Sequence, residues 1–337
     1  MLNFDESRFV GIQAGAVALA EPLDAAIADL LKKGATNLFF LGAGGAGVLM
    51  QPAAQLLQRN SAFPAFLENA AELMAVDSSN LGADSIVVIP SLSGTTKEAL
   101  EVNAFAQAKG ATVIGLTGNE ESPLARAVDV NFTNAAADDT SSESFYLQSL
   151  LLSLSILRHR GELADYDRVV SELELLPAQL LEVKRAFEGR AASLAQQFKD
   201  ESYHIFTGAG ASWTEAWYFA TCILEEMQWI RTRPVHASDY FHGTLELVEG
   251  GVSVVLLKGE GPTRALAERV ERFTPTVTDT FTVIDTADFE LRGVSEDVRA
   301  LVSHVLHATL LERFSAHLEV VRDHPLTTRR YYRRLDY

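Results

Sequence analysis

Short runs of apolar residues alternate along the chain with longer segments in which apolar residues recur at helical spacing. Helical segments of this kind include 14–33, 140–159 and 180–199. Strands separated by helices of about ten to twenty residues indicate parallel sheets that are covered on both faces. The pattern therefore predicts an α/β protein with doubly wound, flavodoxin-like parallel sheets. The short apolar runs that we expect to be strands lie within 37–47, 88–98, 112–117, 203–213, 252–257 and 281–286.

The two halves of the chain repeat the same order of elements. An apolar strand runs into a glycine turn at Gly42 and again at Gly208. From Gly42 to Ser91, in the loop after a later apolar run, is 49 positions, and from Gly208 to Lys258 is 50. We therefore predict two tandem domains of one fold, residues 1–160 and 161–337.

The composition narrows the class of protein. Acids outnumber bases 45 to 28, and the net charge of −17 opposes binding to nucleic acid. No apolar stretch reaches the ~18 residues that span a bilayer, and the N-terminus lacks the pattern of a secretory signal. We expect a cytoplasmic protein without a membrane span, in which the single Cys222 is a small buried residue.

A glycine motif raises one alternative. Gly42, Gly44 and Gly47 fit the spacing GxGxxG after a strand, and Glu68 follows about where a dinucleotide fold places its ribose-binding acid. In the second half, however, Trp213 stands at the third glycine position, where a bulky ring is expected to block close helix packing. The glycines also suit tight turns that bring a backbone close to a ligand. We expect neither a nicotinamide cofactor nor a metal.

Four hydroxyl side chains gather between a strand and a helix in VIPSLSGTTKE, residues 88–98. One hydroxyl is enough for a helix N-cap, and Thr95 followed by Glu98 has the spacing of a capping box. The additional hydroxyl groups suit a phosphate, because hydroxyls and the free N–H groups of a helix N-terminus bind anions. We therefore assign phosphate binding to the loop residues Ser91, Ser93, Gly94, Thr95 and Thr96.

The corresponding loop of the second half reads LLKGEGPT. Of the hydroxyls it keeps only Thr263, and it has gained Glu260. We expect only the first half to hold phosphate.

A largely apolar helix at 213–230 ends in the paired acids Glu225 and Glu226. Neighbouring side chains on a helix point about 100° apart, so one acid can be solvated while the other is enclosed. A carboxylate enclosed by apolar neighbours would have a raised pKa, which suits it to move protons near neutral pH. His242 follows in a loop, where it could be a turn residue, but imidazole is also suited to proton shuttling.

Together these elements resemble the tandem sugar isomerase (SIS) family, which includes the isomerase half of glucosamine-6-phosphate synthase. The phosphosugar loop of the family, S-x-S-G-x-T, is matched by residues 91–96. The base of the family lies in a helix-end motif similar to LEEMQW, which by position selects Glu226 over Glu225. The acid/base histidine lies in a K-H-G-P-like motif, matched at His242. The resemblance covers nearly the whole chain and implies that Glu226 and His242 are catalytic.

Departures from the synthase bear on the reaction. The synthase has a lysine near its C-terminus, where the similar tail DHPLTTRR places Arg330, and an arginine is a poor proton carrier. A serine-threonine-lysine motif is replaced around Ser142, and the glutaminase domain is absent. The tail, the EMQW helix end and the FHG loop are more similar to the deglycase branch of the family. We assign further substrate contacts to Gly42, Gly44, Gly45, Ser141, Glu143 and Arg330, with Glu143 at the amine portion.

The resemblance implies a deglycase that converts compounds such as fructoselysine 6-phosphate into glucose 6-phosphate and an amine. Glu226 would move a proton between C1 and C2 through an enaminol, His242 would exchange protons with the sugar oxygens, and water would hydrolyse the Schiff base. The family also implies a homodimer with a shared active site, because the histidine crosses the interface. Two alternatives stay open: an aldose-ketose or amino-sugar phosphate isomerase or deaminase, and a non-catalytic phosphosugar sensor.

Overall fold

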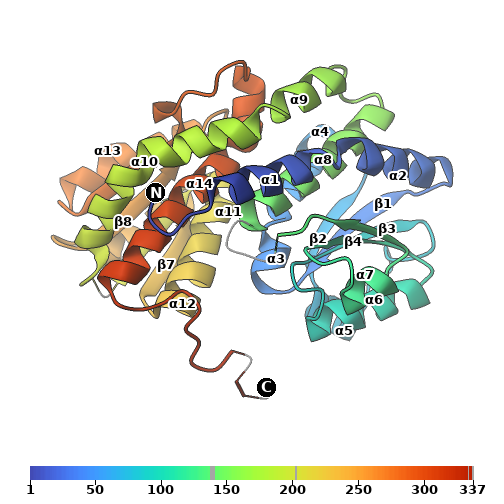
Figure 1. The fold of residues 1–337 in the computed structure, drawn as a ribbon, viewed down its shortest axis with the longest axis horizontal. Coiled ribbons are helices and arrows are strands. Elements are labelled where there is room, and N and C mark those ends of the chain that lie inside the picture. The colour runs from blue at the N-terminus through green and yellow to red at the C-terminus, as the bar shows by residue number, and fades with distance from the viewer. Residues whose placement is uncertain (137–140, 202, 333, 336–337) are drawn as a thin grey trace. The chain divides into compact units, whose positions relative to one another are not determined.

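The computed structural model describes residues 1–136, 141–201, 203–332 and 334–335. The chain forms two compact units, which we call the first unit, Glu6–Pro177, and the second unit, Met1–Asp5 with Ala178–Tyr337. Each unit contains one parallel sheet (Figure 1). The two sheets confirm the predicted α/β class. In the described part of the chain, no helix is both long enough and apolar enough to cross a membrane.

The first unit is built on five parallel strands in the order β2-β1-β3-β4-β5. This is the flavodoxin-like order, and it differs from that of dinucleotide-binding folds, which argues against the nicotinamide alternative. The central strands are nearly continuous apolar runs, as expected for strands buried on both faces. The strands are β1 (Asn37–Gly42), β2 (Ala65–Asn69), β3 (Ser85–Ser91), β4 (Thr112–Thr117) and β5 (Val130–Thr133).

Helices cover both faces of this sheet (Figure 1). In register, Phe39 lies beside Phe66 of β2 and Val87 of β3, and Phe39 and Val87 join the apolar core on one face. The helices of that face are α5 (Ala70–Val76), α6 (Lys97–Ala108) and α7 (Pro123–Ala127). On the other side, α8 (Ser141–His159) packs against α1 (Glu6–Val17), α2 (Ala20–Lys32) and α4 (Gln51–Asn60). The unit also contains α3 (Gly44–Val48) and α9 (Tyr166–Leu173).

The prediction of one helix at 14–33 is wrong, because two helices meet at Ala18 and Leu19. Pro22 explains the break. Its ring would clash with the carbonyl four residues earlier, that of Ala18, and it has no N–H to donate. Helix α2 instead starts afresh, and the N–H of Leu23 bonds the carbonyl of Leu19 at 2.9 Å.

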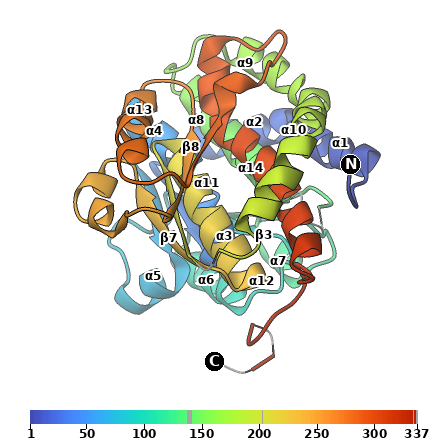
Figure 2. The same cartoon turned by 90° about the vertical axis from the view of Figure 1, so that its left-hand side faces the viewer.

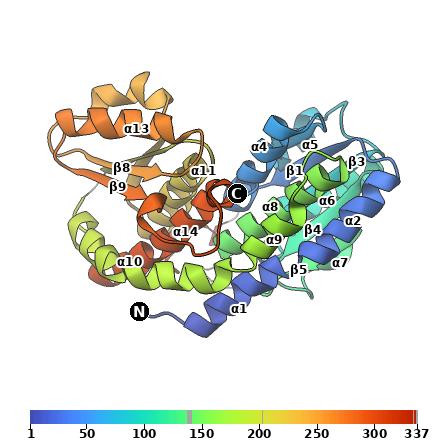
Figure 3. The same cartoon turned by 90° about the horizontal axis from the view of Figure 1, so that it is seen from above.

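The second unit is built on four parallel strands in the order β7-β6-β8-β9. If β6 corresponds to β1, this order repeats that of the first four strands of the other sheet. The strands are β6 (Tyr203–Gly208), β7 (Arg231–His236), β8 (Ser253–Lys258) and β9 (Phe281–Asp285). Helix α13 (Arg264–Phe273) covers one face (Figure 3), and the other carries α10 (Leu176–Phe198), α11 (Ala211–Tyr218) and α14 (Glu296–Val321) (Figure 2).

Aromatic side chains fix the helical layer of the second unit to its sheet. Phe206 of β6 lies 5.7 Å from Phe219, measured between ring centroids, and Phe219 lies 5.6 Å from Phe314 of α14. Aromatic pairs of this kind contribute about 0.5–1.5 kcal/mol beyond the burial of their area. The chain segment that follows Phe219 and leads to Glu226 is therefore anchored at its start.

Candidate active site

The hydroxyl-rich loop lies at the carboxyl end of β3, where doubly wound sheets bind ligands. Ser91 is buried, and its Oγ accepts a hydrogen bond from the N–H of Gly94 at 3.1 Å. Gly94 has a φ of 62°, and a Cβ there would lie 2.1 Å from Oγ of Ser122, so the turn requires glycine. Oγ of Ser93 accepts hydrogen bonds from the N–H of Thr95 at 3.3 Å and from its hydroxyl at 2.9 Å.

Helix α6 begins one residue later than the predicted capping box requires. Thr96 is the N-cap residue, and its side chain makes no capping hydrogen bond. The prediction that Thr95 and Glu98 form a capping box is therefore wrong, because the Thr95 hydroxyl is bonded to Ser93 instead. The first turn of a helix leaves its N–H groups without intrahelical partners, so this helix start keeps donors that a phosphate can use.

The glycine turn after β1 brings the strand and the following helix into backbone contact. A Cβ on Gly42 would lie 2.3 Å from the Cα of Gly47, so this pair serves the packing of β1 on α3. Gly44 has a φ of 55° and opens α3 together with Gly45. In the second unit a Cβ on Gly208 would lie 3.1 Å from the backbone nitrogen of Trp213, so the expected block to helix packing is absent there.

The predicted substrate residues at the start of α8 have different surroundings. Ser141 begins the helix, and its side chain lies outside what the structure describes. Glu143 is fully buried, and its carboxylate accepts a hydrogen bond from the Ser142 hydroxyl at 3.1 Å.

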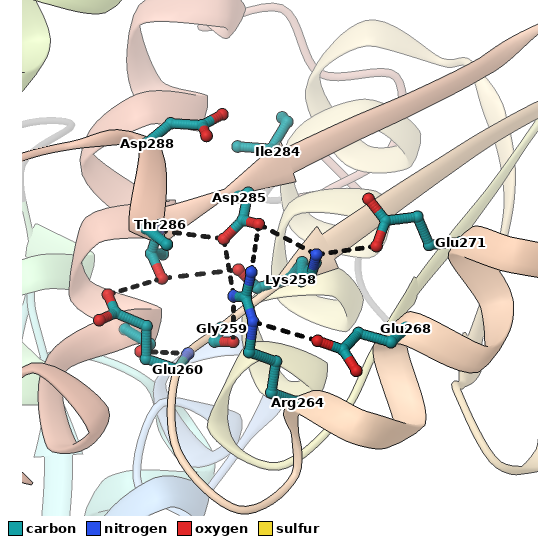
Figure 4. Close-up of polar contacts among 12 residues, drawn as sticks. Lys258, Gly259, Glu260, Arg264, Glu268, Glu271, Ile284, Asp285, Thr286 and Asp288 are labelled. Carbon is teal, nitrogen blue, oxygen red and sulfur yellow. Dashed lines mark hydrogen bonds and ion pairs between the residues drawn. The ribbon is translucent and has the colours of Figure 1, made fainter.

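The loop after β8 has an internal ion pair where the loop after β3 has hydroxyls. Glu260 accepts hydrogen bonds from Nε of Arg299 at 2.8 Å and from its Nη2 at 2.7 Å. The Thr286 hydroxyl donates to the same carboxylate at 3.1 Å (Figure 4). The two charged side chains are largely buried, with 14% of Arg299 and 18% of Glu260 exposed.

A second set of charges surrounds Asp285 beside this loop (Figure 4). Arg264 donates to both carboxylate oxygens of Asp285, at 2.8 and 2.6 Å, and Lys258 lies 3.2 Å from Asp285 and 2.8 Å from Glu271. Burial alone would lower the pKa of Lys258, but the hydrogen bonds to Glu271 and Asp285 outweigh it and raise that pKa. Likewise, burial alone would raise the pKa of Asp285, but the bond from Arg264 and further hydrogen bonds lower it.

The segment predicted as one helix at 213–230 consists of three pieces. Helix α11 passes into a π-helix at Phe219–Glu225, then into a single turn, α12 (Glu226–Gln228). Trp229 ends the segment in the left-handed region, with a φ of 56°. The π-helix is a rare structure that is frequent at functional sites. The left-handed backbone of Trp229 is strained.

The paired acids at this helix end face different partners. Oε1 of Glu225 accepts hydrogen bonds from the Thr232 hydroxyl at 2.6 Å and from its N–H at 3.2 Å. Oε1 of Glu226 accepts a hydrogen bond from Nε of Arg329 at 2.9 Å, and the two side chains are 37% and 19% exposed. The sequence left open whether apolar side chains enclose one of the two acids; they do not enclose Glu226, because a guanidinium group holds its carboxylate in a half-exposed position.

A pocket of about 750 Å³ lies beside this carboxylate. It is lined by α12, the start of β7 and the C-terminal tail, which leaves α14 next to α12 (Figure 2). The sequence pointed to Arg330 in this tail, and the guanidinium of Arg330 lies 4.1 Å from the ring of Trp229. Arg329, which contacts Glu226, was not predicted as a site residue. Its position beside Arg330 in the basic tail was the feature of the sequence that could have indicated it.

His242 and Cys222 lie apart from these contacts. His242 is exposed at the end of a short 3-10 turn, Asp239–Phe241, and is not among the residues that line the pocket. Burial, with smaller effects from Glu226 and other acids, raises the pKa of Cys222 to about 12, so its thiol stays protonated. Among the described residues, no group of three His, Cys, Asp or Glu side chains is placed to hold a metal ion.

Comparisons with known proteins agree with the predicted family. Residues 31–158 match the SIS domain. Fructosamine deglycase FrlB from Bacillus subtilis (strain 168) is 28% identical over 94% of this chain and 97% of its own length. Fructoselysine 6-phosphate deglycase from Escherichia coli (strain K12) is 23% identical over 91% of this chain and 88% of its own length.

Solved structures extend the likeness to both units. A Salmonella typhimurium LT2 protein, provisionally named a phosphosugar isomerase, has a TM-score of 0.88 and 29% identity, covering 94% of this chain and 97% of its own. The C-terminal domain of glucosamine-fructose-6-phosphate aminotransferase from Francisella tularensis shares the fold, with a TM-score of 0.80, 17% identity and coverage of 94% and 96%. These matches confirm the predicted resemblance to the SIS domain family over residues 31–158 and the likeness of fold over both units.

Proposed function

We propose that the protein is a deglycase that cleaves 6-phosphorylated fructosamines to glucose 6-phosphate and an amine. The observation that carries the proposal is the half-exposed carboxylate of Glu226, held by Arg329 beside a pocket large enough for part of a substrate. Similarity along nearly the whole chain to proteins named fructosamine and fructoselysine 6-phosphate deglycases supports it.

The proposal assigns the phosphate to the loop after β3. This loop offers hydroxyl groups and the start of a twelve-residue helix, and no acidic side chain stands between Ser91 and Thr96. Neutral donors at a helix N-terminus favour a phosphate dianion. The loop after β8 is a poor candidate, because Glu260 already occupies its guanidinium donor, Arg299.

The proposed chemistry needs one base that moves a proton between neighbouring carbons. Glu226 takes a proton from C1 of the open-chain ketoamine while the C2 oxygen gains one, which gives the enaminol. Glu226 then returns a proton to C2, and the product is a Schiff base at C1. Water adds to this imine, the C1–N bond breaks, and glucose 6-phosphate and the amine leave. His242 exchanges protons with the sugar oxygens.

We also propose that the protein acts as a homodimer in the cytoplasm, with an active site shared between subunits. His242 is exposed and does not line the pocket beside Glu226. A histidine supplied by the other subunit would meet the need for a second proton carrier. The fold family, rather than a contact within this chain, is the basis of this part of the proposal.

Replacing each acid of the pair in turn tests the assignment of the base. Glu226→Gln should lower kcat by about 10²- to 10⁴-fold, the usual contribution of an acid-base group, and leave the affinity for glucose 6-phosphate unchanged. Glu225→Gln is the matched control, because Glu225 is bonded to Thr232, and should keep most of the activity. If both variants turn over the substrate equally well, the base is assigned to the wrong residue.

The second candidate is an aldose-ketose isomerase, which the name of the Salmonella relative favours. The same proton transfer between C1 and C2 would serve it, but no imine would be hydrolysed. Interconversion of fructose 6-phosphate and glucose 6-phosphate, without release of an amine from fructosamines, would favour this candidate.

A further inference from the structure

The backbone of the loop that carries His242, residues 239–248, is fixed on both sides of the histidine. The N–H of His242 donates to the carbonyl of Asp239 at 2.8 Å. On the other side, Gly243 has a φ of 131°, which favours glycine, and its carbonyl accepts a hydrogen bond from the N–H of Glu246 at 3.1 Å. These turns leave the backbone at His242 little freedom.

The two aromatic residues before His242 anchor the loop in the second unit. Tyr240 is fully buried, and its hydroxyl lies 3.1 Å from that of Thr274. The ring of Phe241 lies 5.5 Å from that of Phe273, measured between ring centroids. The loop is therefore attached beside the end of α13 immediately before the histidine.

The imidazole of His242, by contrast, is exposed. Within the part of the chain that the structure describes, it makes no hydrogen bond, ion pair or ring contact. An anchored loop thus presents a side chain that is available to a group the loop itself does not supply.

Arg233 of β7 holds the loop on the other side of the histidine. Its Nε donates to the hydroxyl of Thr244 at 3.1 Å, and Thr244 is only 2% exposed. Among the described residues, this hydroxyl is the one hydrogen-bond acceptor of the guanidinium. A guanidinium is planar and rigid, so its N–H bond fixes direction as well as distance. The contact therefore sets where the loop lies relative to β7.

The same strand also reaches the pocket beside Glu226. Thr232, which precedes Arg233 in β7, lines that pocket and donates to Glu225. Neighbouring side chains of a strand point to opposite faces of the sheet. Strand β7 therefore holds the helix end that carries Glu226 with one residue and the His242 loop with the next, and it packs against both segments.

We infer that Arg233 is a positioning residue, which keeps the His242 loop in the conformation that proton transfer requires. The inference rests on the proposed function, since it takes His242 as a proton carrier. Loss of the bond to Thr244 would let the histidine shift, and a displacement of about 1 Å can cost about 100-fold in rate. The alternative is a purely structural arginine, whose effect on activity would not depend on His242.

A double-mutant cycle with the histidine separates these two roles. Arg233→Gln should lower kcat for a 6-phosphorylated fructosamine by about 10- to 100-fold and leave the dissociation constant of glucose 6-phosphate unchanged. In the His242→Gln protein the same substitution should have no further effect, because no imidazole remains to be positioned. Equal losses with and without His242, or a native kcat in Arg233→Gln, would overturn the inference.

Two further variants locate the contact. Thr244→Val removes the hydrogen-bond acceptor with little change of shape, so its kcat should match that of Arg233→Gln. Arg272→Gln is the control, because Arg272 is an exposed arginine of α13, and it should keep the native kcat. A native kcat in Thr244→Val would show that Arg233 does not act through this bond.

Hydrogen exchange gives a readout that does not depend on turnover. Deuterium uptake by peptides that cover residues 239–248 should be faster in Arg233→Gln than in the native protein, with uptake in α13 unchanged. Unchanged uptake at 239–248 would overturn the inference whatever the enzyme turns over. Faster uptake there, in a protein that releases no glucose 6-phosphate from any fructosamine, would uphold the positioning contact and refute the deglycase.

Discussion

The loops after β3 and β8 stand at corresponding places in the two sheets, and each joins its strand to a helix across five residues. Each has a glycine with positive φ, Gly94 at 62° and Gly261 at 85°. Each ends in a threonine N-cap without a side-chain capping bond, Thr96 before α6 and Thr263 before α13. Counting back from the two helices, the position of Ser93 in one loop is that of Glu260 in the other.

The two loops differ in whether the protein itself supplies an anion to the hydrogen-bond donors around them. In the second unit, the Glu260 carboxylate takes the N–H groups of Arg299 and the Thr286 hydroxyl, so an internal anion is already present. In the first unit, the loop residues Ser91 to Thr96 supply hydroxyls and no acid. Loops of equal length at corresponding strand ends thus hold a structural ion pair in one unit and form the proposed phosphate site in the other.

The largest expected effect comes from copying the acid of the second loop into the first. Ser93→Glu should weaken the binding of glucose 6-phosphate by at least about 100-fold, because a carboxylate would repel the phosphate and compete for its donors. Ser93→Gln is the control, since it adds similar bulk without charge and should cost less. Isothermal titration calorimetry measures both, and native-like affinity in Ser93→Glu would show that the loop does not hold the phosphate.

Removing the acid from the second loop should instead cost stability. Glu260→Ala leaves the largely buried Arg299 guanidinium without its partner, which should lower the free energy of unfolding by about 3 kcal/mol. All three tryptophans, Trp213, Trp217 and Trp229, lie in the second unit, so urea unfolding followed by tryptophan fluorescence reports on it.

The matched control for this variant is Glu268→Ala. Glu268 pairs with Arg264 at 3.5 Å but is 40% exposed, so its loss should cost under about 1 kcal/mol. Equal unfolding curves for the Glu260 and Glu268 variants would contradict the structural role of the internal ion pair.

The two units should also differ in their response to acid. Burial lowers the pKa of His307 to about 4 and that of His304 to about 3, from an ordinary value of 6.5. Both are neutral in the fold and take up protons on unfolding below pH 6.5, so stability is complete above that pH and is lost between pH 6.5 and 4. At pH 5 each should cost about 2 kcal/mol.

Urea unfolding at pH 7 and pH 5, followed by tryptophan fluorescence, measures this loss in the second unit. The only histidine of the first unit is His159. His307→Asn should remove part of the pH dependence. Identical unfolding free energies at the two pH values would contradict the buried neutral histidines.

The smallest effect concerns the corrected helix cap. Thr95→Ala and Thr96→Ala should each change the free energy of unfolding by under about 0.5 kcal/mol, because neither hydroxyl caps α6. Asn69→Ala is a positive control of about 1 kcal/mol, since Asn69 accepts hydrogen bonds from the N–H groups of Ala71 and Glu72. A loss near 1 kcal/mol for Thr95→Ala would restore the capping box.

The central strands and the apolar edge strand β9 were predictable from the sequence, whereas the edge strands β2, β5 and β7 were not. The apolar runs of β1, β4, β6 and β8 are visible because both of their faces are buried. At an edge, β7 reads RTRPVH, whose polar residues and proline are tolerated only where one side of the strand is unpaired. Local sequence therefore shows the apolar strands of each sheet but not the polar strands at its edges.

Contacts between distant residues escaped the sequence for a different reason. Glu226 could be singled out because it ends an apolar helix, but its partner Arg329 lies 103 positions away. The pair of Glu260 and Arg299 spans 39 positions in the same way. The π-helix before Glu226 has no known signature in a single sequence, because it depends on how Phe219 packs against the sheet and α14.

The most direct test of the central claim is to incubate the purified protein with fructoselysine 6-phosphate and to measure glucose 6-phosphate and free lysine. A parallel reaction with fructosyl-glycine 6-phosphate covers a shorter amine portion. The proposed function predicts that both products appear in equal amounts and that Glu226→Gln releases them at least about 100-fold more slowly. Absence of glucose 6-phosphate from both fructosamines, together with turnover of fructose 6-phosphate, would contradict it.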